Sequence, residues 1–266
     1  MPELAEVEFY RKQWDCGLNA PILAVHLHPG KRIFRGQNLA ALRRLVPGAK
    51  LVFSEARGKQ MLFRFSNHAW LGLHLGMTGT LRADQSALEP GRHDHLVLRQ
   101  KSRSLVLNDP RCFGRVLFHV GANAPEWWAK LPLPINSGAF TRAGLAEFLQ
   151  GHGRAPLKAV LLRQDGFPGV GNWMADEILW QTGLHPRTPA GRLHAAQVQA
   201  VWRVTRFVCR VALQKIGKDW SDPPAGWFFH ERWAKSGRCP RHRAVLERAT
   251  VGGRTTAWCA RCQARG

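Results

Sequence analysis

The sequence predicts an α+β protein in which an antiparallel β-sandwich with a flanking helix precedes a helical domain. Between residues 51 and 120 of the 266, short runs rich in Val, Leu and Phe recur at close spacing, as is typical of an antiparallel sandwich or barrel. Beyond residue 140, apolar residues recur three and four positions apart, which indicates helices. A proline-rich break at 131–140 separates the two patterns, so we expect a linker there.

An amphipathic helix is expected at the very start of the chain. In MPELAEVEFYRKQW, Leu4, Val7 and Trp14 fall at helical spacing. Pro2 suits a first helical turn because its missing N–H would have no partner there, and early glutamates favour the positive helix end. The strands expected after this helix are two in LVFSEARGKQMLFRF around a Gly58–Lys59 turn, one or more in AWLGLHLGMTGTLR, a hairpin in HLVLRQKSRSLVLND, and RVLFHV.

The second half of the chain predicts a helical bundle that ends in a cysteine-rich segment. Its expected helices are FTRAGLAEFLQ, PLKAVLLRQ, NWMADEILWQTG and AAQVQAVWRVTRFVCRVALQKIG. The predicted division is a sandwich domain at 1–130, a linker at 131–140, a helical domain at 141–232 and a cysteine-rich end at 233–266.

The charge of the chain indicates a polyanionic partner. Thirty-nine Lys and Arg against eighteen Asp and Glu give a net charge of +21 and a pI near 11.2. A surplus of this size on a folded protein favours nucleic acid over a membrane surface, because no basic amphipathic helix with large apolar flanks is evident. The start of the chain also lacks the apolar stretch of a signal peptide, so we expect a cytoplasmic, nucleoid-associated protein.

The cysteine-rich end has the ligand spacing of a structural zinc site. Two residues separate Cys239 from His242 and Cys259 from Cys262, and sixteen residues separate the pairs. Three thiolates and one imidazole can occupy the corners of a tetrahedron and leave no open position for catalysis. The alternative, free thiols beside a redox-active CxxC pair, does not account for the first pair. Between the ligands, GGRTT predicts a tight hairpin with Arg254 at its tip.

A glycine-rich turn precedes one of the predicted helices. In LLRQDGFPGVGNWMADEILW, Gly169 and Gly171 stand just before a helix that is expected to start at Asn172. Glycines and free amides at a helix N-terminus can approach a phosphate closely. An ordinary turn between two helices is the alternative.

Two loops of the first half combine residues that can enter a base stack. HLGMTG holds Met77, and NDPRCFG holds Arg111 and Phe113 two positions apart. A thioether, a guanidinium and an aromatic ring can form a wedge that stands in for an extruded base. Taken singly, Met77 and Phe113 are better interpreted as core residues.

Together these motifs resemble one family. MPELAEVE, the Lys59 hairpin, HLGMTG, HDH, NDPRCFG, GVGNWMADE and GGRTTAWCARCQ occur in the order and approximate spacing of the formamidopyrimidine-DNA glycosylase and endonuclease VIII (Fpg/Nei) family. The resemblance covers nearly the whole chain. It implies an N-terminal β-sandwich, a helix-two-turns-helix domain at 141–232, a zinc finger at 233–266, and a bifunctional DNA glycosylase and AP lyase of base excision repair.

The resemblance also implies the catalytic residues. In the family, the proline exposed by methionine removal is the nucleophile, which would be Pro2 here. An α-amino group has a pKa of about 8, so part of it is neutral near pH 7, and a secondary amine that attacks a sugar carbon gives an iminium ion. Glu3 is the implied general acid and base, with Glu6 in support, and Lys59 would contact the phosphate beside the lesion.

Further residues are implied to bind damaged double-stranded DNA. Met77, Arg111 and Phe113 resemble the void-filling triad, while Asn172 and Arg254 resemble a phosphate clamp. The resemblance further implies one structural zinc ion and a monomer that acts without a membrane. Glu177 would either anchor the N-terminal amine or have a structural role. The additional DNA contacts implied by the resemblance are Lys158 and His93.

Four departures from the family pattern affect details. Ala5 replaces a second proline, Cys112 replaces a second arginine, and His242 replaces a cysteine ligand. The segment 217–227 (GKDWSDPPAGW) is short for a loop that closes over an oxidised purine, which favours pyrimidine lesions or a broader range. The alternative functions are a hydrolytic, monofunctional DNA glycosylase and a DNA-damage-binding protein without catalysis.

Overall fold

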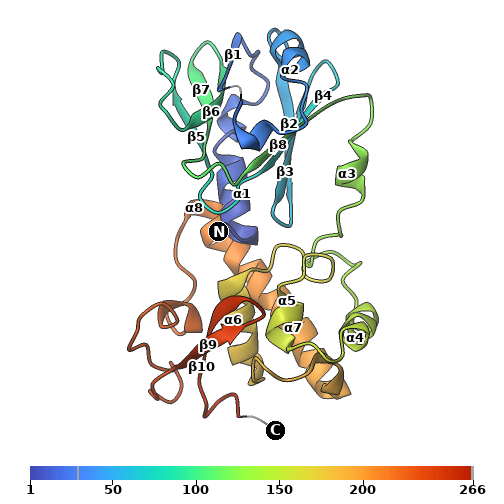
Figure 1. The fold of residues 1–266 in the computed structure, drawn as a ribbon, viewed down its shortest axis with the longest axis vertical. Coiled ribbons are helices and arrows are strands. Elements are labelled where there is room, and N and C mark those ends of the chain that lie inside the picture. The colour runs from blue at the N-terminus through green and yellow to red at the C-terminus, as the bar shows by residue number, and fades with distance from the viewer. Residues whose placement is uncertain (29, 265–266) are drawn as a thin grey trace. The chain divides into compact units, whose positions relative to one another are not determined.

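The computed structural model describes residues 1–28 and 30–264, which form two compact units. The first unit comprises Met1–Pro2 and Glu6–Leu131, and the second comprises Glu3–Ala5 and Pro132–Gly266. Helix α1 (Leu4–Lys12) therefore begins in the second unit and continues in the first. The helix starts two residues later than Pro2, so the expectation of a helix from the first residue is corrected (Figure 1).

The first unit is a sandwich of two four-stranded antiparallel sheets. Their strand orders are β1-β6-β7-β5 and β2-β3-β4-β8 (Figure 1). Trp14 and Phe63 pack at 4.8 Å between ring centroids within the core between the sheets. The strands are β1 (Ala24–Leu27), β2 (Leu51–Arg57), β3 (Gln60–Phe65), β4 (Ala69–His74), β5 (Thr80–Gln85), β6 (Asp94–Arg99), β7 (Arg103–Asn108) and β8 (Arg115–Val120).

One strand and two α-helices of this unit were not expected. Strand β1 is only four residues long and has one fully buried residue, which is too little for a clear strand signal in the sequence. Helices α2 (Leu39–Leu45) and α3 (Glu126–Ala129) are seven and four residues long, too short for a clear period. The Asn38 side chain, which accepts a hydrogen bond from Ala41 N at 2.9 Å, is the one signal that marks the start of α2.

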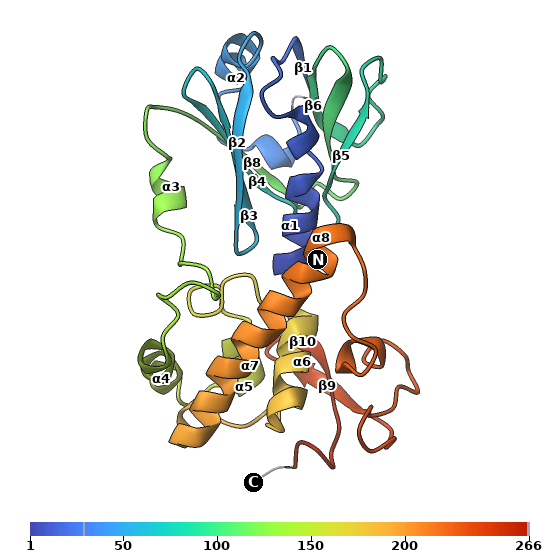
Figure 2. The ribbon, with the colours of Figure 1, turned by 180° about the vertical axis from the view of Figure 1, so that it is seen from behind.

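The second unit is built around two neighbouring helices. α6 (Asn172–Thr182) is buried from Trp173 to Trp180, while the amphipathic α7 (Ala195–Gln214) packs beside it (Figure 2). No helix among the described residues is long and apolar enough to cross a bilayer. The other helices of this unit are α4 (Arg142–Gly151), α5 (Leu157–Leu161) and α8 (Ile216–Asp219).

A β-hairpin near the C-terminus completes the second unit. β9 (Glu247–Val251) and β10 (Arg254–Trp258) are joined by Gly252 and Gly253, whose φ angles of 60° and 73° suit the tight turn. The predicted α+β fold, with a sandwich, a helical domain and a terminal hairpin, is confirmed. The finer division at residues 130, 140 and 232 stays a prediction.

Candidate functional site

The N-terminus of α6 binds an anion that the chain itself supplies. The Glu3 carboxylate accepts hydrogen bonds from Trp173 N at 3.0 Å and from Met174 N at 3.2 Å. These amides belong to the first helical turn, which has no backbone acceptors for them and carries a partial positive charge. The expectation that the glycine-rich turn receives a phosphate is therefore corrected, because Glu3 occupies these donors.

The two glycines of GVGN make room for the N-terminal segment. A Cβ on Gly171 would lie 2.2 Å from Cδ of Glu3, which no real contact allows. Gly169 has a φ of +90°, and its carbonyl accepts a hydrogen bond from Leu4 N at 3.0 Å. The glycine pattern in the sequence thus marks the place where the fold receives Glu3, the residue that follows Pro2 in the chain.

Lys158 lies inside the second unit. Its side chain is 0% exposed, and its ammonium group donates to Asp176 Oδ1 at 2.5 Å and to the Asn172 carbonyl at 2.6 Å. Arg232 binds the other oxygen of Asp176 at 2.7 Å. Burial lowers the pKa of Lys158, against the opposing effect of Asp176. The prediction of a direct DNA contact at Lys158 is thus corrected to a supporting position beneath Asn172.

The two predicted clamp residues belong to neighbouring segments of the second unit. Asn172 Nδ2 donates to the carbonyl of Thr255 at 2.9 Å, which ties the start of α6 to strand β10. Arg254, the residue before Thr255, is exposed at the beginning of that strand. The structure therefore joins the segments that carry the two residues, while their contact with DNA stays a prediction.

Glu177 is enclosed within the second unit. Its carboxylate accepts hydrogen bonds from Gln181 Nε2 at 2.8 Å and from Phe229 N at 2.9 Å. Burial raises its pKa to about 7, although these hydrogen bonds favour the charged form. These contacts agree with the structural role that the sequence left open.

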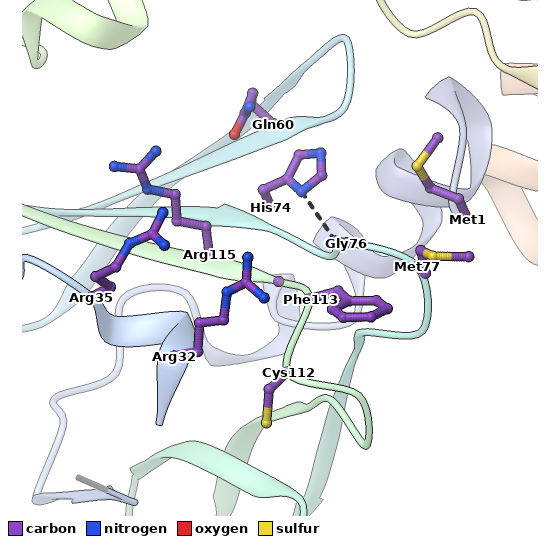
Figure 3. A pocket seen from close by; sticks show the side chains of 11 residues that line it. Met1, Arg32, Arg35, Gln60, His74, Gly76, Met77, Cys112, Phe113 and Arg115 are labelled. Carbon is purple, nitrogen blue, oxygen red and sulfur yellow. Dashed lines mark hydrogen bonds between the residues drawn. The ribbon is translucent and has the colours of Figure 1, made fainter. Parts of the chain in front are cut away.

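The first unit contains a pocket of about 500 Å³ beside the predicted wedge (Figure 3). Met77 and Phe113 line this pocket and are 41% and 44% exposed, which excludes the alternative that they are core residues. The guanidinium of Arg111 lies 4.6 Å from the centre of the Phe113 ring. Met1, which precedes Pro2, lines the same pocket.

A residue that sequence reasoning missed holds the two wedge loops together. The buried Asp109 carboxylate accepts hydrogen bonds from Gly114 N at 2.7 Å and from Thr78 Oγ1 at 3.0 Å, and so joins NDPRCFG to HLGMTG. Gly76, with a φ of +64°, allows the loops to meet, since a Cβ there would lie 2.3 Å from the carbonyl carbon of Phe113. An Asp-Pro pair that opens a turn was the available signal.

Lys59 and His93 belong to the first unit as well. Lys59 follows Gly58 in the turn between β2 and β3 and is 8% exposed. Burial lowers the pKa of His74, which lines the pocket, and the charge of Lys59 lowers it further. His93 is half-buried, and its carbonyl accepts a hydrogen bond from Asp109 N at 3.0 Å.

The four predicted metal ligands lie together. One donor atom from each of them falls within 4.8 Å of the others, and Cys262 Sγ lies 3.0 Å from His242 Nδ1. Three thiols and an imidazole are the donor set that structural zinc prefers. The residues therefore fit a zinc ion, held by Cys239, His242, Cys259 and Cys262.

The comparisons with known proteins agree with this geometry. Residues 1–116 match the family described as formamidopyrimidine-DNA glycosylase N-terminal domain, and residues 132–222 match its H2TH domain. A formamidopyrimidine-DNA glycosylase of Xanthomonas euvesicatoria pv. vesicatoria is 34% identical, over 99% of this chain and all of that protein. The corresponding protein of Thermus thermophilus is also 34% identical, over the full length of both chains.

Solved structures show the same fold. The MutM (Fpg) protein of Thermus thermophilus has a TM-score of 0.81 and 32% identity, with complete coverage of both chains. The Lactococcus lactis enzyme, solved with DNA that contains an AP site, has a TM-score of 0.85 at 24% identity and covers 99% of this chain. A β-sandwich followed by an H2TH domain defines a class of DNA repair proteins. This chain belongs to the formamidopyrimidine-DNA glycosylase and endonuclease VIII family.

Proposed function

We propose that this protein is a DNA glycosylase of base excision repair that also cleaves the strand as an AP lyase. The observation that carries the proposal is the pair of hydrogen bonds by which the amides of α6 hold the carboxylate of Glu3, the residue that follows Pro2 in the chain. Relatives that match over their whole length are named formamidopyrimidine-DNA glycosylases, which supports the glycosylase activity.

The mechanism starts from the amine of Pro2 after removal of Met1. The nitrogen lone pair attacks the anomeric carbon of the damaged nucleotide, and the base leaves with the electrons of its bond to that carbon and takes up a proton from water. Glu3 accepts the proton that the nitrogen loses and passes it to the sugar oxygen as the ring opens. The resulting iminium ion draws electrons from the neighbouring sugar carbon. Loss of a proton there expels the 3′ phosphate, and a second elimination releases the 5′ phosphate.

DNA binding is assigned to residues of both units. In the first unit, Met77, Arg111 and Phe113 fill the space that the extruded nucleotide leaves, with Lys59 and His93 as backbone contacts. Exposure of the wedge residues supports this role. In the second unit, Asn172 and Arg254 contact phosphates. We propose that the enzyme works as a monomer on damaged double-stranded DNA in the cytoplasm, at the nucleoid.

One zinc ion has a structural role in this proposal. When bound, it cross-links the loops that flank the hairpin β9–β10. The hairpin carries Arg254, and Thr255 accepts the hydrogen bond from Asn172, so the metal supports the proposed clamp. The lesion class is proposed from segment 217–227, which is short for a loop that closes over an oxidised purine. We expect the enzyme to excise pyrimidine lesions in addition to the ring-opened purines that the relatives' names indicate.

Borohydride trapping tests the mechanism. The Met1-processed protein is incubated with duplexes that carry 8-oxoguanine, a formamidopyrimidine, dihydrouracil, 5-hydroxycytosine or an abasic site, and the iminium ion is reduced to a stable adduct. We expect an adduct with the abasic site and with at least one lesion. Base release without any adduct would favour a hydrolytic glycosylase, and tight binding without either product would favour a non-catalytic damage-binding protein.

A further inference from the structure

Three arginines that the proposed mechanism does not use line the pocket of the first unit. Arg32 opens the short helix η2 (Arg32–Phe34), Arg35 follows it, and Arg115 is the first residue of β8. All three line the pocket of about 500 Å³, and their guanidinium groups reach into the same space (Figure 3). The arginines come from segments some eighty residues apart, so the fold brings them together.

The three charges are not neutralised within the described part of the chain. No Asp or Glu lines the pocket, and none of the three guanidinium groups makes a hydrogen bond or ion pair with a described residue. Other arginines of this unit are paired, as Arg82 is with Asp94 at 2.9 Å. Like charges that converge without a counter-charge repel one another. An anion that enters the pocket relieves this repulsion, so its binding is favourable.

The segment that carries Arg32 and Arg35 is held in place. Between them, Ile33 and Phe34 are buried in the core of the sandwich. Gln37 Oε1 then accepts a hydrogen bond from Phe118 N at 2.7 Å, which fastens the end of this segment to β8. The backbone of the arginines is therefore fixed before a ligand arrives, which lowers the entropic cost of binding.

A neutral donor adds to the pocket. His74 Nδ1 accepts a hydrogen bond from Gly76 N at 3.0 Å, which assigns the ring proton to Nε2. Burial and Lys59 both lower the pKa of this imidazole, so the neutral form is favoured. The lining then consists of guanidinium donors, an imidazole N–H and the Gln60 amide, which together match the oxygens of a phosphate.

We propose that Arg32, Arg35 and Arg115 form a phosphate-binding site that takes one phosphate group of a DNA strand beside the wedge residues Met77 and Phe113. The choice of DNA as the source of the phosphate rests on the proposed function. Two kinds of group have this chemistry, an internal phosphodiester and the terminal phosphate of a nicked or gapped strand. Three guanidinium groups can bind either, and the experiment separates them.

The test compares the DNA binding of variants that lose positive charge inside the pocket with that of a variant that loses it elsewhere. Arg115→Ala and the double variant Arg32→Ala/Arg35→Ala remove the site, while Arg44→Ala removes an exposed charge of α2 that does not line the pocket. Binding is titrated at several salt concentrations on a duplex with a tetrahydrofuran abasic analogue, which cannot form an iminium ion. We expect roughly tenfold weaker binding and a salt slope smaller by about one for the pocket variants, beyond the change in Arg44→Ala.

Chemical changes in the DNA identify the phosphate. Replacing single phosphates by neutral methylphosphonates should reveal one position that weakens binding to the unaltered protein and has little further effect in Arg115→Ala. If the group is terminal, the effect appears instead on gapped duplexes, where a 5′-phosphate binds more tightly than a 5′-hydroxyl only while the arginines are present. Either result supports the site.

The proposal is overturned if the pocket variants match Arg44→Ala in affinity and salt slope on all of these duplexes. Arg115→Lys, which restores the charge, and thermal unfolding of each variant show whether a loss comes from misfolding. The result is independent of the glycosylase chemistry. Normal borohydride trapping with unchanged binding would reject only the phosphate site, and a smaller salt slope without any trapping would reject only the proposed reaction.

Discussion

The carboxylate of Glu3 lies 3.0 Å from the backbone nitrogen of Trp173, although 170 residues separate the two in sequence. This hydrogen bond places the implied acid and base of the reaction at the positive end of α6. The position of Glu3 therefore depends on the start of a helix in the second unit, and substitutions there are expected to affect the reaction.

Gly171→Ala should impair the chemistry more than DNA binding. The added methyl group would overlap Cδ of Glu3 at 2.2 Å, so the carboxylate must leave its two amides. We expect borohydride trapping on abasic DNA to fall at least about tenfold, which corresponds to about 1.4 kcal/mol. Gly151→Ala is the matched control, because nothing lies within 4 Å of a Cβ built there. Equal trapping by both variants would show that Glu3 has no part in the reaction.

Pro2→Gly, or retention of Met1, should reduce covalent trapping far more than duplex binding. Both changes alter the amine that attacks the sugar and leave the binding residues in place. The measurement pairs trapping on an abasic duplex with the affinity for an uncleavable analogue. A parallel loss in both quantities would count against an amine nucleophile at this position.

Arg254→Ala should weaken binding to all DNA sequences and reduce the salt slope by about one, as the loss of one phosphate contact requires. Arg192→Ala serves as the control, since Arg192 is also exposed in the second unit and lies outside the hairpin. A slope that stays the same in Arg254→Ala would mean that this side chain does not touch the backbone.

Cys259→Ser should release zinc and weaken DNA binding through the hairpin. Metal binding and local folding are coupled, so loss of one of four ligands destabilises the loops that hold β9 and β10. Metal content and affinity are measured on the same preparation, with Cys16→Ser, at an exposed cysteine of the first unit, as the control. Retained zinc together with full affinity would remove the metal from the proposed clamp.

Glu177 should make the second unit less stable as the pH rises. Its pKa is about 7 in the folded protein against an ordinary value of 4.5, so the folded state binds more protons between these values. The contribution of Glu177 to the free energy of unfolding is then greatest below pH 4.5. It falls by about 3 kcal/mol as the pH rises through 7. Glu177→Gln should flatten this dependence in thermal unfolding between pH 5 and 8. Glu147→Gln, at an exposed position of α4, should leave it unchanged.

Regular elements and metal ligands could be predicted from the sequence because their signals are local. Short apolar runs located β6 and β7 on either side of their turn, and the spacing of Cys239 and Cys259 to their partners identified the ligand set. Strand β1 was missed because it is only four residues long and has one fully buried residue, which is too little for a clear strand signal. Its place in the sheet comes from pairing with β6, which lies about seventy residues further along the chain.

The misinterpreted site residues depend on partners that are distant in the sequence. Lys158 is a basic residue of the kind that contacts DNA, and only its ion pair with Asp176, which Arg232 also binds, shows that it is internal. Likewise, the glycines before α6 have the pattern of a phosphate-binding turn. The bound anion could be recognised only once the fold had brought Glu3 to the same amides.

Asp109 fixes the two wedge loops without involving the side chains at their tips. Its carboxylate fastens both loops through backbone and threonine donors and makes no bond to the side chains of Met77 or Phe113. The spacing of the loops is thus independent of the residues at their tips. Those tips can be exchanged, by evolution or by design, while the frame beneath them is inherited unchanged.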